Sequence, residues 1–314
     1  MKLGIVGMGA VGAAIAMAAS QRGSAREMVL VNRHPERSKA VALDMHYGAP
    51  LSKLAAIRAG DYDDLAGAGV VVITAGINEK AGGATDRSDP QGRLRLFDKN
   101  VEVFQDVVPR VKRAAPGAVI VIATDPPDPL AEIARAIAGH ERVISTGTYL
   151  DTLRFRVHLA ERFGISPATV DANVVGEHGT SSVFLWSSAS IGGMPLPEAV
   201  VKRGWDFADF RQKIEKEVRE ANIAIIEGIG ASQYGIGILS ARIAETILRD
   251  EREVVPIGSH NPRYGTTISL PSVVGKEGIL DVMLPDMSPE ELRALEESAE
   301  RLRGIVRGAM PKLG

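Results

Sequence analysis

The feature that most constrains this chain is a glycine-rich turn close to its start. A short apolar run at residues 3–6 leads into Gly7-Met8-Gly9-Ala10-Val11-Gly12, and a helical pattern rich in small residues opens within this motif. In that context the first glycine permits a tight turn, the second lets a pyrophosphate approach the backbone, and the third lets helix and strand pack closely. The alternative is a glycine-rich turn without a ligand. We expect a dinucleotide site whose contacts come from Gly7, Gly9, Ala10, Val11 and Gly12.

Apolar runs alternate with helical patterns through the first half of the chain. The runs Val70–Ile73 and Val119–Ile122 are β-branched and continuous, which is typical of parallel strands buried on both faces. Such alternation predicts an α/β fold with a doubly wound parallel sheet. We therefore expect a dinucleotide-binding domain in residues 1–147, followed by an α+β substrate domain in residues 148–314.

The pattern changes after Gly147. Residues 150–163 predict a helix, 170–175 a strand, 207–250 a long helical pattern interrupted by glycines, and 254–257 and 266–270 two strands. Ser288 and Glu291 form a capping-box pair that predicts the start of a C-terminal helix.

Composition excludes several classes of protein. The 314 residues include no cysteine, which removes disulfides, thiolate zinc sites and iron–sulfur clusters, and we expect no metal site. The net charge of −2 does not indicate a nucleic-acid partner. Apolar stretches are too short for a membrane helix, and the first strand begins too early for a signal peptide. We expect a cytoplasmic protein that binds neither membrane nor nucleic acid.

The end of the second predicted strand bears on the choice of cofactor. An acid that binds the ribose hydroxyls is expected there, but the sequence has Asn32 followed by Arg33. An acid would repel a 2′-phosphate, whereas a neutral side chain beside a guanidinium accommodates one. The sequence favours NADP over NAD, unless Arg33 simply points into solvent.

Three side chains in the second half suggest acid–base chemistry. His178 stands between glycines in Gly176-Glu177-His178-Gly179, after a predicted strand, where an imidazole can be presented to a cleft. Asp151 and Arg154 lie three apart on one helix face. A carboxylate beside an imidazole fixes its tautomer, and a guanidinium fork matches a substrate carboxylate. Taken singly, each has an ordinary explanation, as a turn histidine or a surface ion pair.

Together these motifs resemble the L-lactate/malate dehydrogenase family. The resemblance includes the run Leu150-Asp151-Thr152-Leu153-Arg154-Phe155-Arg156, the Gly-Glu-His-Gly motif, Thr74-Ala75-Gly76 and Ser269-Leu270-Pro271, and it follows the family's order along nearly the whole chain. It implies hydride transfer between a nicotinamide and the C2 carbon of a small 2-keto or L-2-hydroxy acid, lactate-like or a larger monocarboxylate. It implies His178 as proton donor and acceptor, Asp151 as its partner and Arg154 as carboxylate clamp.

The resemblance also assigns residues that spacing alone does not. Arg93 matches the loop arginine that polarises the substrate carbonyl, and Arg87 is a rival for that role. Ser232 lies where the family has a small hydroxyl residue in the substrate pocket. Thr74, Ala75, Gly76 and Asn100 would lie at the cofactor.

The sequence departs from the family's pattern at several positions. Asp125 replaces an asparagine, and it could raise the proton affinity of the imidazole, be protonated itself, or bind a cationic or hydroxyl group of the substrate. Glu79, or Lys80 if the alignment shifts, occupies the position that discriminates substrates, and a glutamate would repel a second carboxylate. The loop between Gly76 and Arg93 is also longer than the usual lactate-type loop.

A regulatory site of the family is altered as well. Arg156 matches a residue of an anion site between subunits, but the partner histidine of that site is Asp171 here. We therefore expect no activation by a sugar bisphosphate.

Three functions remain open at this stage. The first is an NAD(P)-dependent 2-hydroxy acid dehydrogenase, of lactate rather than malate type, which by resemblance would form a homodimer or homotetramer. The second is a sensor that binds NAD(P) without turnover, and the third is a dinucleotide enzyme of other chemistry.

Overall fold

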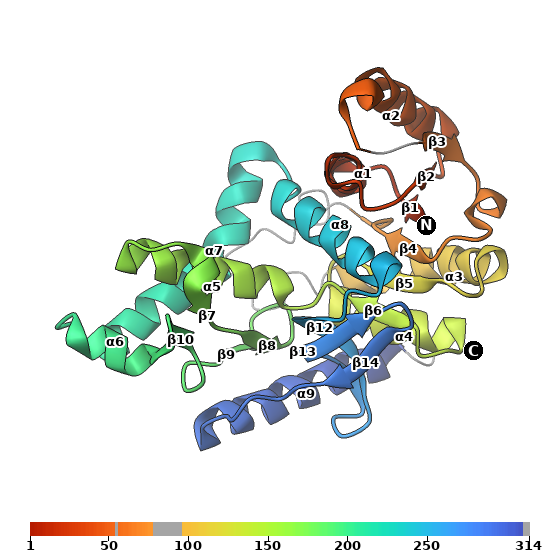
Figure 1. Cartoon of the computed structure of the whole chain (residues 1–314). Helices are drawn as coiled ribbons and strands as arrows, with labels where there is room; N and C mark the ends of the chain where they lie inside the picture. The colour runs from red at the N-terminus through yellow and green to blue at the C-terminus, as the bar shows by residue number, and fades with distance from the viewer. Residues whose placement is uncertain (54–55, 78–95, 310–314) are drawn as a thin grey trace.

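The computed structural model describes residues 1–53, 56–77 and 96–309. Its first half builds a parallel sheet in the order β3-β2-β1-β4-β5-β6 (Figure 1). The order reverses between β1 and β4, and open α/β sheets bind ligands at the carboxyl ends of the strands at such a point. The strands are β1 (Lys2–Val6), β2 (Glu27–Val31), β3 (Ala56–Gly60), β4 (Val70–Ile73), β5 (Val119–Ile122) and β6 (Val143–Ser145).

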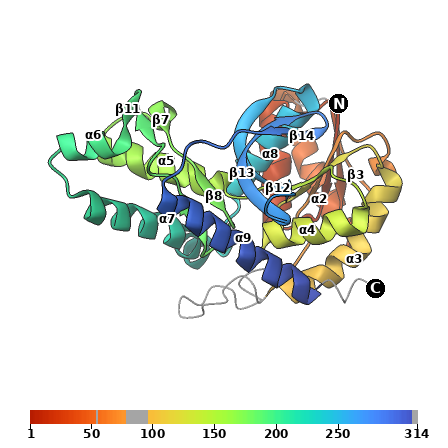
Figure 2. The ribbon, with the colours of Figure 1, turned by 90° about the horizontal axis from the view of Figure 1, so that it is seen from below.

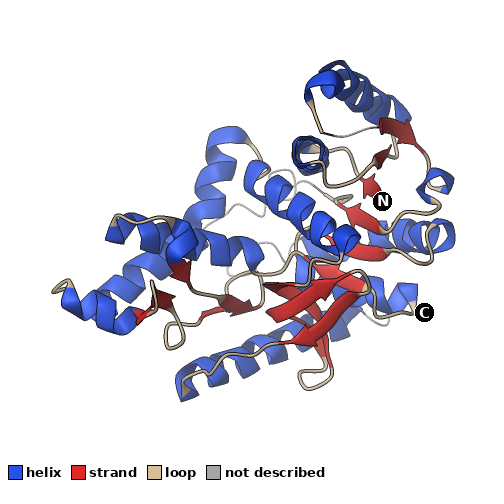
Figure 3. Ribbon diagram, in the orientation of Figure 1, coloured by secondary structure: helices blue, strands red, loops and turns tan. Residues whose placement is uncertain are grey.

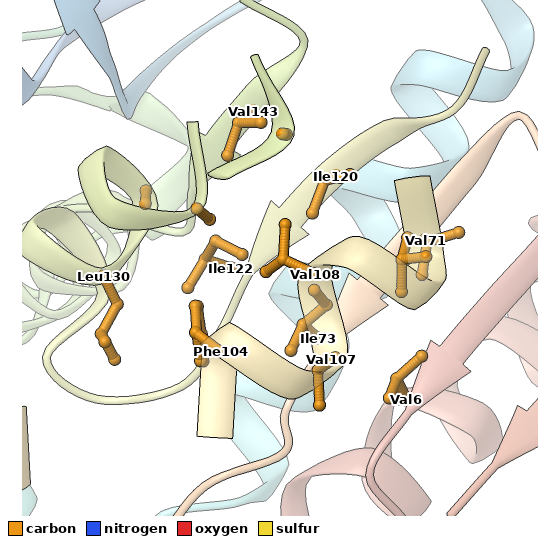
Figure 4. Packing of buried hydrophobic residues seen from close by; sticks show 14 of the residues in the cluster. Val6, Val71, Ile73, Phe104, Val107, Val108, Ile120, Ile122, Leu130 and Val143 are labelled. Atoms are coloured by element: carbon orange, nitrogen blue, oxygen red, sulfur yellow. The ribbon is translucent and has the colours of Figure 1, made fainter. Parts of the chain in front are cut away.

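Helices cover both faces of this sheet, as Figure 3 shows. Alternate residues of a strand point to opposite faces. Val70 and Val72 pack with α1 and α8, whereas Val71 and Ile73 pack with α3 and α4 (Figure 4). The continuous apolar runs are therefore explained by burial on both sides. The helices are α1 (Ala10–Arg22), α2 (Pro35–Gly48), α3 (Phe97–Ala114), α4 (Pro127–Ala138) and α8 (Tyr234–Arg249).

The sheet continues into the second half of the chain through antiparallel strands. From β6 the order runs β12-β13-β8-β9, with β14 beside β13, and a small separate sheet has the order β11-β10-β7. Figure 2 shows α9 crossing beneath the sheet, where it contacts β13 and α4. The strands are β7 (Val170–Asp171), β8 (Val174–Gly176), β9 (Ser182–Phe184), β10 (Ser190–Ile191), β11 (Met194–Pro195), β12 (Glu253–Asn261), β13 (Thr266–Gly275) and β14 (Gly278–Val282); the helices are α5 (Tyr149–Phe163), α6 (Leu196–Lys202), α7 (Phe207–Ile229) and α9 (Pro289–Ala309).

The predicted fold class, a doubly wound parallel α/β sheet followed by an α+β domain, is confirmed. The capping box is also present: the Ser288 N–H donates to Oε2 of Glu291 over 2.8 Å, and the Glu291 N–H donates to Oγ of Ser288 over 3.2 Å. The sequence analysis did not anticipate β14.

The single strand predicted over residues 170–175 is wrong. It forms two strands in different sheets, and the residues between them are bonded to Arg156. Nε of Arg156 donates to the carbonyl of Ala172 over 2.8 Å, and its terminal nitrogen donates to Oδ1 of Asn173 over 3.3 Å.

The long pattern over 207–250 is likewise two helices, α7 and α8, because Gly230 ends α7 in the left-handed conformation at φ 82°. No single helix among the described residues is both long enough and apolar enough to cross a membrane. The α7–α8 pair reaches that threshold by length and composition, with a bend of 115° between its members.

Candidate active site

A cleft opens at the switch point of the sheet, where both halves of the chain contribute to its walls. The glycine turn and the ends of β4 and β5 form one side, and α5, His178 and the α7–α8 junction form the other. Its lining includes Gly9, Ala10, Val11, Gly12, Thr74, Gly76, Ile77, Asp125, Leu150, Arg154, His178, Asn222, Ser232 and Ile236.

Each of the three motif glycines occupies its position for a different physical reason. Gly7 has a φ of +105°, and a Cβ there would lie 2.6 Å from the backbone nitrogen of Ala75. A Cβ on Gly12 would lie 1.9 Å from the carbonyl oxygen of Gly7, so only glycine permits this helix to pack so close to the turn. At Gly9 a Cβ would meet no atom of the described residues within 4 Å, although the residue lines the cleft. Packing of the described residues therefore does not require glycine at position 9. Close approach of a ligand to the backbone would require it.

The start of α1 suits an anion. Among the described residues no side chain caps this helix, and its first turn carries no acidic residue, while Ala10, Val11 and Gly12 line the cleft. A dinucleotide pyrophosphate therefore fits the residues present, with the glycine turn as its cradle.

Asn32 supports the turn. Its Oδ1 accepts from the Met8 N–H over 3.0 Å, and its Nδ2 donates to the carbonyl of His34 over 3.1 Å. Nε of Arg37 donates to the carbonyl of Met8, a contact that the sequence analysis missed. Arg33 is exposed at the end of β2.

The loops after β4 and β5 are joined beneath the cleft. Oγ1 of Thr74 donates to the carbonyl of Gly7 over 2.7 Å. Oδ1 of Asn100 accepts from the Ile77 N–H over 2.8 Å, and its Nδ2 donates to the carbonyl of Asp125 over 2.7 Å. Asn100 is fully buried and its side chain braces these loops, and its predicted contact with a cofactor stays a prediction. Ala75 also packs into the core behind the turn.

The structure brings the three predicted acid–base residues together. Nδ1 of His178 lies 2.5 Å from Oδ2 of Asp151, whose other oxygen accepts from Arg154 over 3.2 Å. The three side chains are only 10% to 12% exposed, so their charges interact with little screening. An ionised Asp151 accepts the Nδ1–H bond and so fixes the tautomer of the ring, which lines the cleft. Asp125 lies beyond Nε2, its Oδ1 3.9 Å away.

A fully buried carboxylate under His178 was missed by the sequence analysis. Oδ2 of Asp128 accepts the backbone N–H of His178 over 2.7 Å, and Oδ1 accepts from Ser145 over 2.6 Å and from Ser269 over 3.3 Å. Burial raises the pKa of Asp128 to about 6, although these hydrogen bonds act to lower it. The available signal was an acidic residue between two prolines in the first turn of the helix that follows β5.

The remaining predicted site residues fall into two groups. Ser232 lines the cleft beside Ala231, and Asn222, which the sequence analysis did not single out, lines it as well. Glu79, Arg87 and Arg93, with Lys80, lie outside the described residues.

The altered regulatory position is filled by the protein's own groups. Besides its bonds to Ala172 and Asn173, a terminal nitrogen of Arg156 lies 3.7 Å from Oδ1 of Asp171.

Across the described ranges 1–53, 56–77 and 96–309, no cluster of three or more His, Asp or Glu side chains is arranged to hold a metal ion.

Comparison with known proteins supplies the family. Residues 1–145 match the family model described as lactate/malate dehydrogenase, NAD binding domain, and residues 148–310 match lactate/malate dehydrogenase, alpha/beta C-terminal domain. The chain belongs to the lactate/malate dehydrogenase family. It is 40% identical over 315 residues to the L-lactate dehydrogenase of Deinococcus radiodurans, with 100% of both chains covered.

Other members of the family are also similar over nearly their full length. The L-lactate dehydrogenase of Thermus aquaticus is 42% identical, with 97% of this chain and 98% of that protein covered. A solved lactate dehydrogenase enzyme from a Medee basin deep-sea metagenome library has a TM-score of 0.89 at 32% identity, with 98% of each chain covered.

Proposed function

We propose that this chain catalyses reversible hydride transfer between a nicotinamide cofactor and the C2 carbon of a small 2-keto or L-2-hydroxy acid. The observation that carries this proposal is the His178, Asp151 and Arg154 cluster in the same cleft as the glycine turn. The names of the relatives, which are L-lactate dehydrogenases, support a lactate-like substrate.

The described residues divide the chemistry among themselves. A bound nicotinamide supplies or accepts the hydride. His178 gives a proton from Nε2 to the C2 oxygen in reduction and takes it back in oxidation, while Asp151 fixes the tautomer and stabilises the imidazolium. Proton transfer of this kind contributes ~10²–10⁴-fold. Arg154 binds the substrate carboxylate with its guanidinium fork and so holds C2 in register.

The loop between β4 and α3 completes this proposal. Arg93, with Arg87 as its rival, stabilises the negative charge that develops on the C2 oxygen. Glu79 disfavours a second substrate carboxylate, which supports a monocarboxylate over malate. A dicarboxylate preference in kinetic assays would instead support a malate dehydrogenase.

For the cofactor, we infer a preference for NADP over NAD. The support is the neutral Asn32 at the end of β2, followed by the exposed Arg33, in place of a carboxylate that would repel a 2′-phosphate. The family model, by its description, is an NAD binding domain, so kcat/KM measured with both reduced cofactors decides between them. A strong preference for NADH would contradict the inference.

We propose that the dinucleotide-binding domain ends at residue 147 and that the substrate domain begins at residue 148. We also propose that the chain forms a homodimer or homotetramer. Large apolar side chains are exposed on the neighbouring helices α1, α2 and α8: Met17 is 52% exposed, Leu43 54%, Tyr47 74% and Ile238 58%. These exposed side chains are candidates for the contact with a second copy of the chain. Light scattering of the purified chain tests the assembly.

The proposed activity is tested with a panel of neutral, acidic and basic 2-keto acids against both reduced cofactors. We expect cofactor oxidation, fastest with a neutral monocarboxylate. Cofactor binding without reduction of any panel member above background would contradict an enzyme and favour the sensor.

A further inference from the structure

The chain leaves the sheet immediately before His178. β8 ends at Gly176, which pairs with Ser269 of β13 and with Ser182 of β9 and has a φ of +88°. Glu177 lies beyond this ladder, yet it is only 4% exposed. Buried backbone N–H groups need hydrogen-bond acceptors, so the segment that carries His178 must find them outside the strands.

Two helices supply these acceptors. Oγ of Ser298, on α9, accepts the N–H of Glu177 over 2.9 Å, and Oδ2 of Asp128, on α4, accepts the next N–H, that of His178, over 2.7 Å. Ser298 and Asp128 are both fully buried. α9 contacts β8 and β9 as it crosses beneath the sheet (Figure 2). The backbone at the catalytic histidine is therefore held from α4 and from the C-terminal helix.

Further contacts tie the same segment to α9. Oε2 of Glu177 accepts from Oγ of Ser181 and lies 3.3 Å from Nε of Arg301. Oγ of Ser181 lies 3.0 Å from Oγ of Ser298. A Cβ at Gly176 would lie 2.8 Å from the same Ser298 oxygen, so the helix approaches the strand end closely enough to require glycine there.

We propose that Ser298 is a positioning residue that holds the His178 imidazole in its catalytic direction, and that Arg301 assists by holding Glu177. This rests on the proposed function and deepens it, because it adds α9 to the machinery of the same site. Without the Ser298 hydroxyl, the buried Glu177 N–H loses its acceptor, and the backbone shifts to recover one. The imidazole then turns away from Asp151, and proton transfer is sensitive to such a displacement.

The test is Ser298→Ala, studied by stopped flow. Enzyme in excess over reduced cofactor is mixed with a neutral 2-keto acid, and cofactor oxidation is followed in a single turnover. We expect the rate constant to fall by about tenfold to 100-fold, while the amplitude and the dissociation constant of the cofactor stay unchanged. A merely structural role would reduce the fraction of active enzyme, and so would lower the amplitude and leave the rate constant unchanged. That result would contradict the proposal.

A spectroscopic readout follows the imidazole itself. Nδ1 of His178 is bonded to Asp151 over 2.5 Å, and a proton in so short a bond gives a low-field NMR resonance. The resonance is identified by its absence from His178→Gln. We expect it to move upfield in Ser298→Ala, because its chemical shift falls as the hydrogen bond lengthens. A resonance that does not move would contradict the proposal.

Ser38→Ala is the matched control. It removes another buried helical hydroxyl, one that donates to the carbonyl of Pro35 over 2.9 Å within α2. The rate constant and the resonance should both stay at their wild-type values.

Arg301 provides a second pair of variants if Ser298→Ala does not fold. Its side chain is 38% exposed, so substitution there should be tolerated. Arg301→Gln should lower the rate constant by about two- to fivefold, the size of a partly exposed ion pair, and Arg301→Lys should restore part of the loss. Wild-type rate constants in both would contradict the role of α9.

The outcomes separate the two proposals. An unchanged rate constant in folded Ser298→Ala would contradict the role of Ser298 and leave the dehydrogenase proposal standing. If the wild type reduces no 2-keto acid, the proposed function fails, and the resonance decides the positioning role by itself: a shift in Ser298→Ala supports it, and an unmoved resonance contradicts it.

Discussion

The end of the cleft at the glycine turn is made of backbone, whereas the end at His178 is made of buried charges. Gly7, Gly9 and Gly12 shape the first by leaving out side chains. Asp128 and Asp151 hold His178 at the second through hydrogen bonds of 2.7 and 2.5 Å. The difference follows from what each end must do. A dinucleotide needs close approach to N–H groups, whereas proton transfer needs one nitrogen held in one direction.

Removing the imidazole of His178 should affect the end of the cleft that holds the buried charges and not the glycine turn. It should give the largest effect on kcat. We expect His178→Gln to lower kcat by about 10³-fold, within the range for general acid–base catalysis. The dissociation constant of the cofactor should change little, because the glycine turn is intact. Steady-state kinetics and cofactor titration check both; kcat near the wild-type value would remove His178 from its role.

The buried carboxylates near His178 should also make the free energy of unfolding depend on pH. Two carboxylates on α4, Asp128 and Glu132, test this. The pKa of Asp128 is about 6, above the ordinary 3.8, so its contribution to folding is fully present below pH 4 and is lost as pH rises through 6. Asp128→Asn should abolish that loss, which is on the order of 3 kcal/mol. Its kcat should nevertheless fall, because the support under His178 is altered.

Glu132→Gln is the matched control on the same helix. Burial acts to raise the pKa of Glu132, but Arg135, Thr267 and His260 together lower it below its ordinary value. Its contribution is therefore present above that value and is lost as pH falls, so this variant should be less stable than wild type near pH 7. Unfolding free energies from denaturant titrations between pH 4 and 8 check both; parallel curves for the two variants would contradict the comparison.

The backbone end can be tested by adding a single methyl group. Gly9→Ala should weaken cofactor binding by tenfold or more while leaving the melting temperature unchanged, because the new Cβ meets open cleft. Gly117→Ala is the control, since a Cβ there also meets no atom within 4 Å in the part of the chain that the structure describes. Equal cofactor affinities for the two variants would mean that no ligand approaches Gly9.

A smaller effect is expected at the end of β2. Asn32→Asp should lower kcat/KM for NADPH by about tenfold with less effect on NADH, because a carboxylate repels the 2′-phosphate. Arg33→Ser should act in the same direction, and together the two variants separate repulsion from lost attraction. Unaltered cofactor ratios in both would end the argument for NADP.

The last prediction is that an effector leaves the kinetics unchanged. A sugar bisphosphate should leave the half-saturating substrate concentration unchanged, because Arg156 is already engaged by Ala172, Asn173 and Asp171. A clear drop on adding the effector would contradict this expectation.

The sequence predicted local features better than distant ones. The turn at Gly7 to Gly12 and the helix face shared by Asp151 and Arg154 are set by near neighbours, so their spacing revealed them. Asp128 could not be placed, because its partners His178 and Ser269 lie 50 and 141 residues away. The bracing role of Asn100 could not be predicted for the same reason, since its amide is used by two loops that the sequence alone does not bring together.

Transfer of a labelled hydride tests the central claim most directly. The enzyme is given reduced cofactor carrying deuterium at the transferable C4 position, together with a neutral 2-keto acid, and the product is examined by mass spectrometry. The account predicts deuterium at C2 of the 2-hydroxy acid, formed rapidly by the wild type and about 10³-fold more slowly by His178→Gln. Product without deuterium, or equal rates for the two proteins, would contradict it.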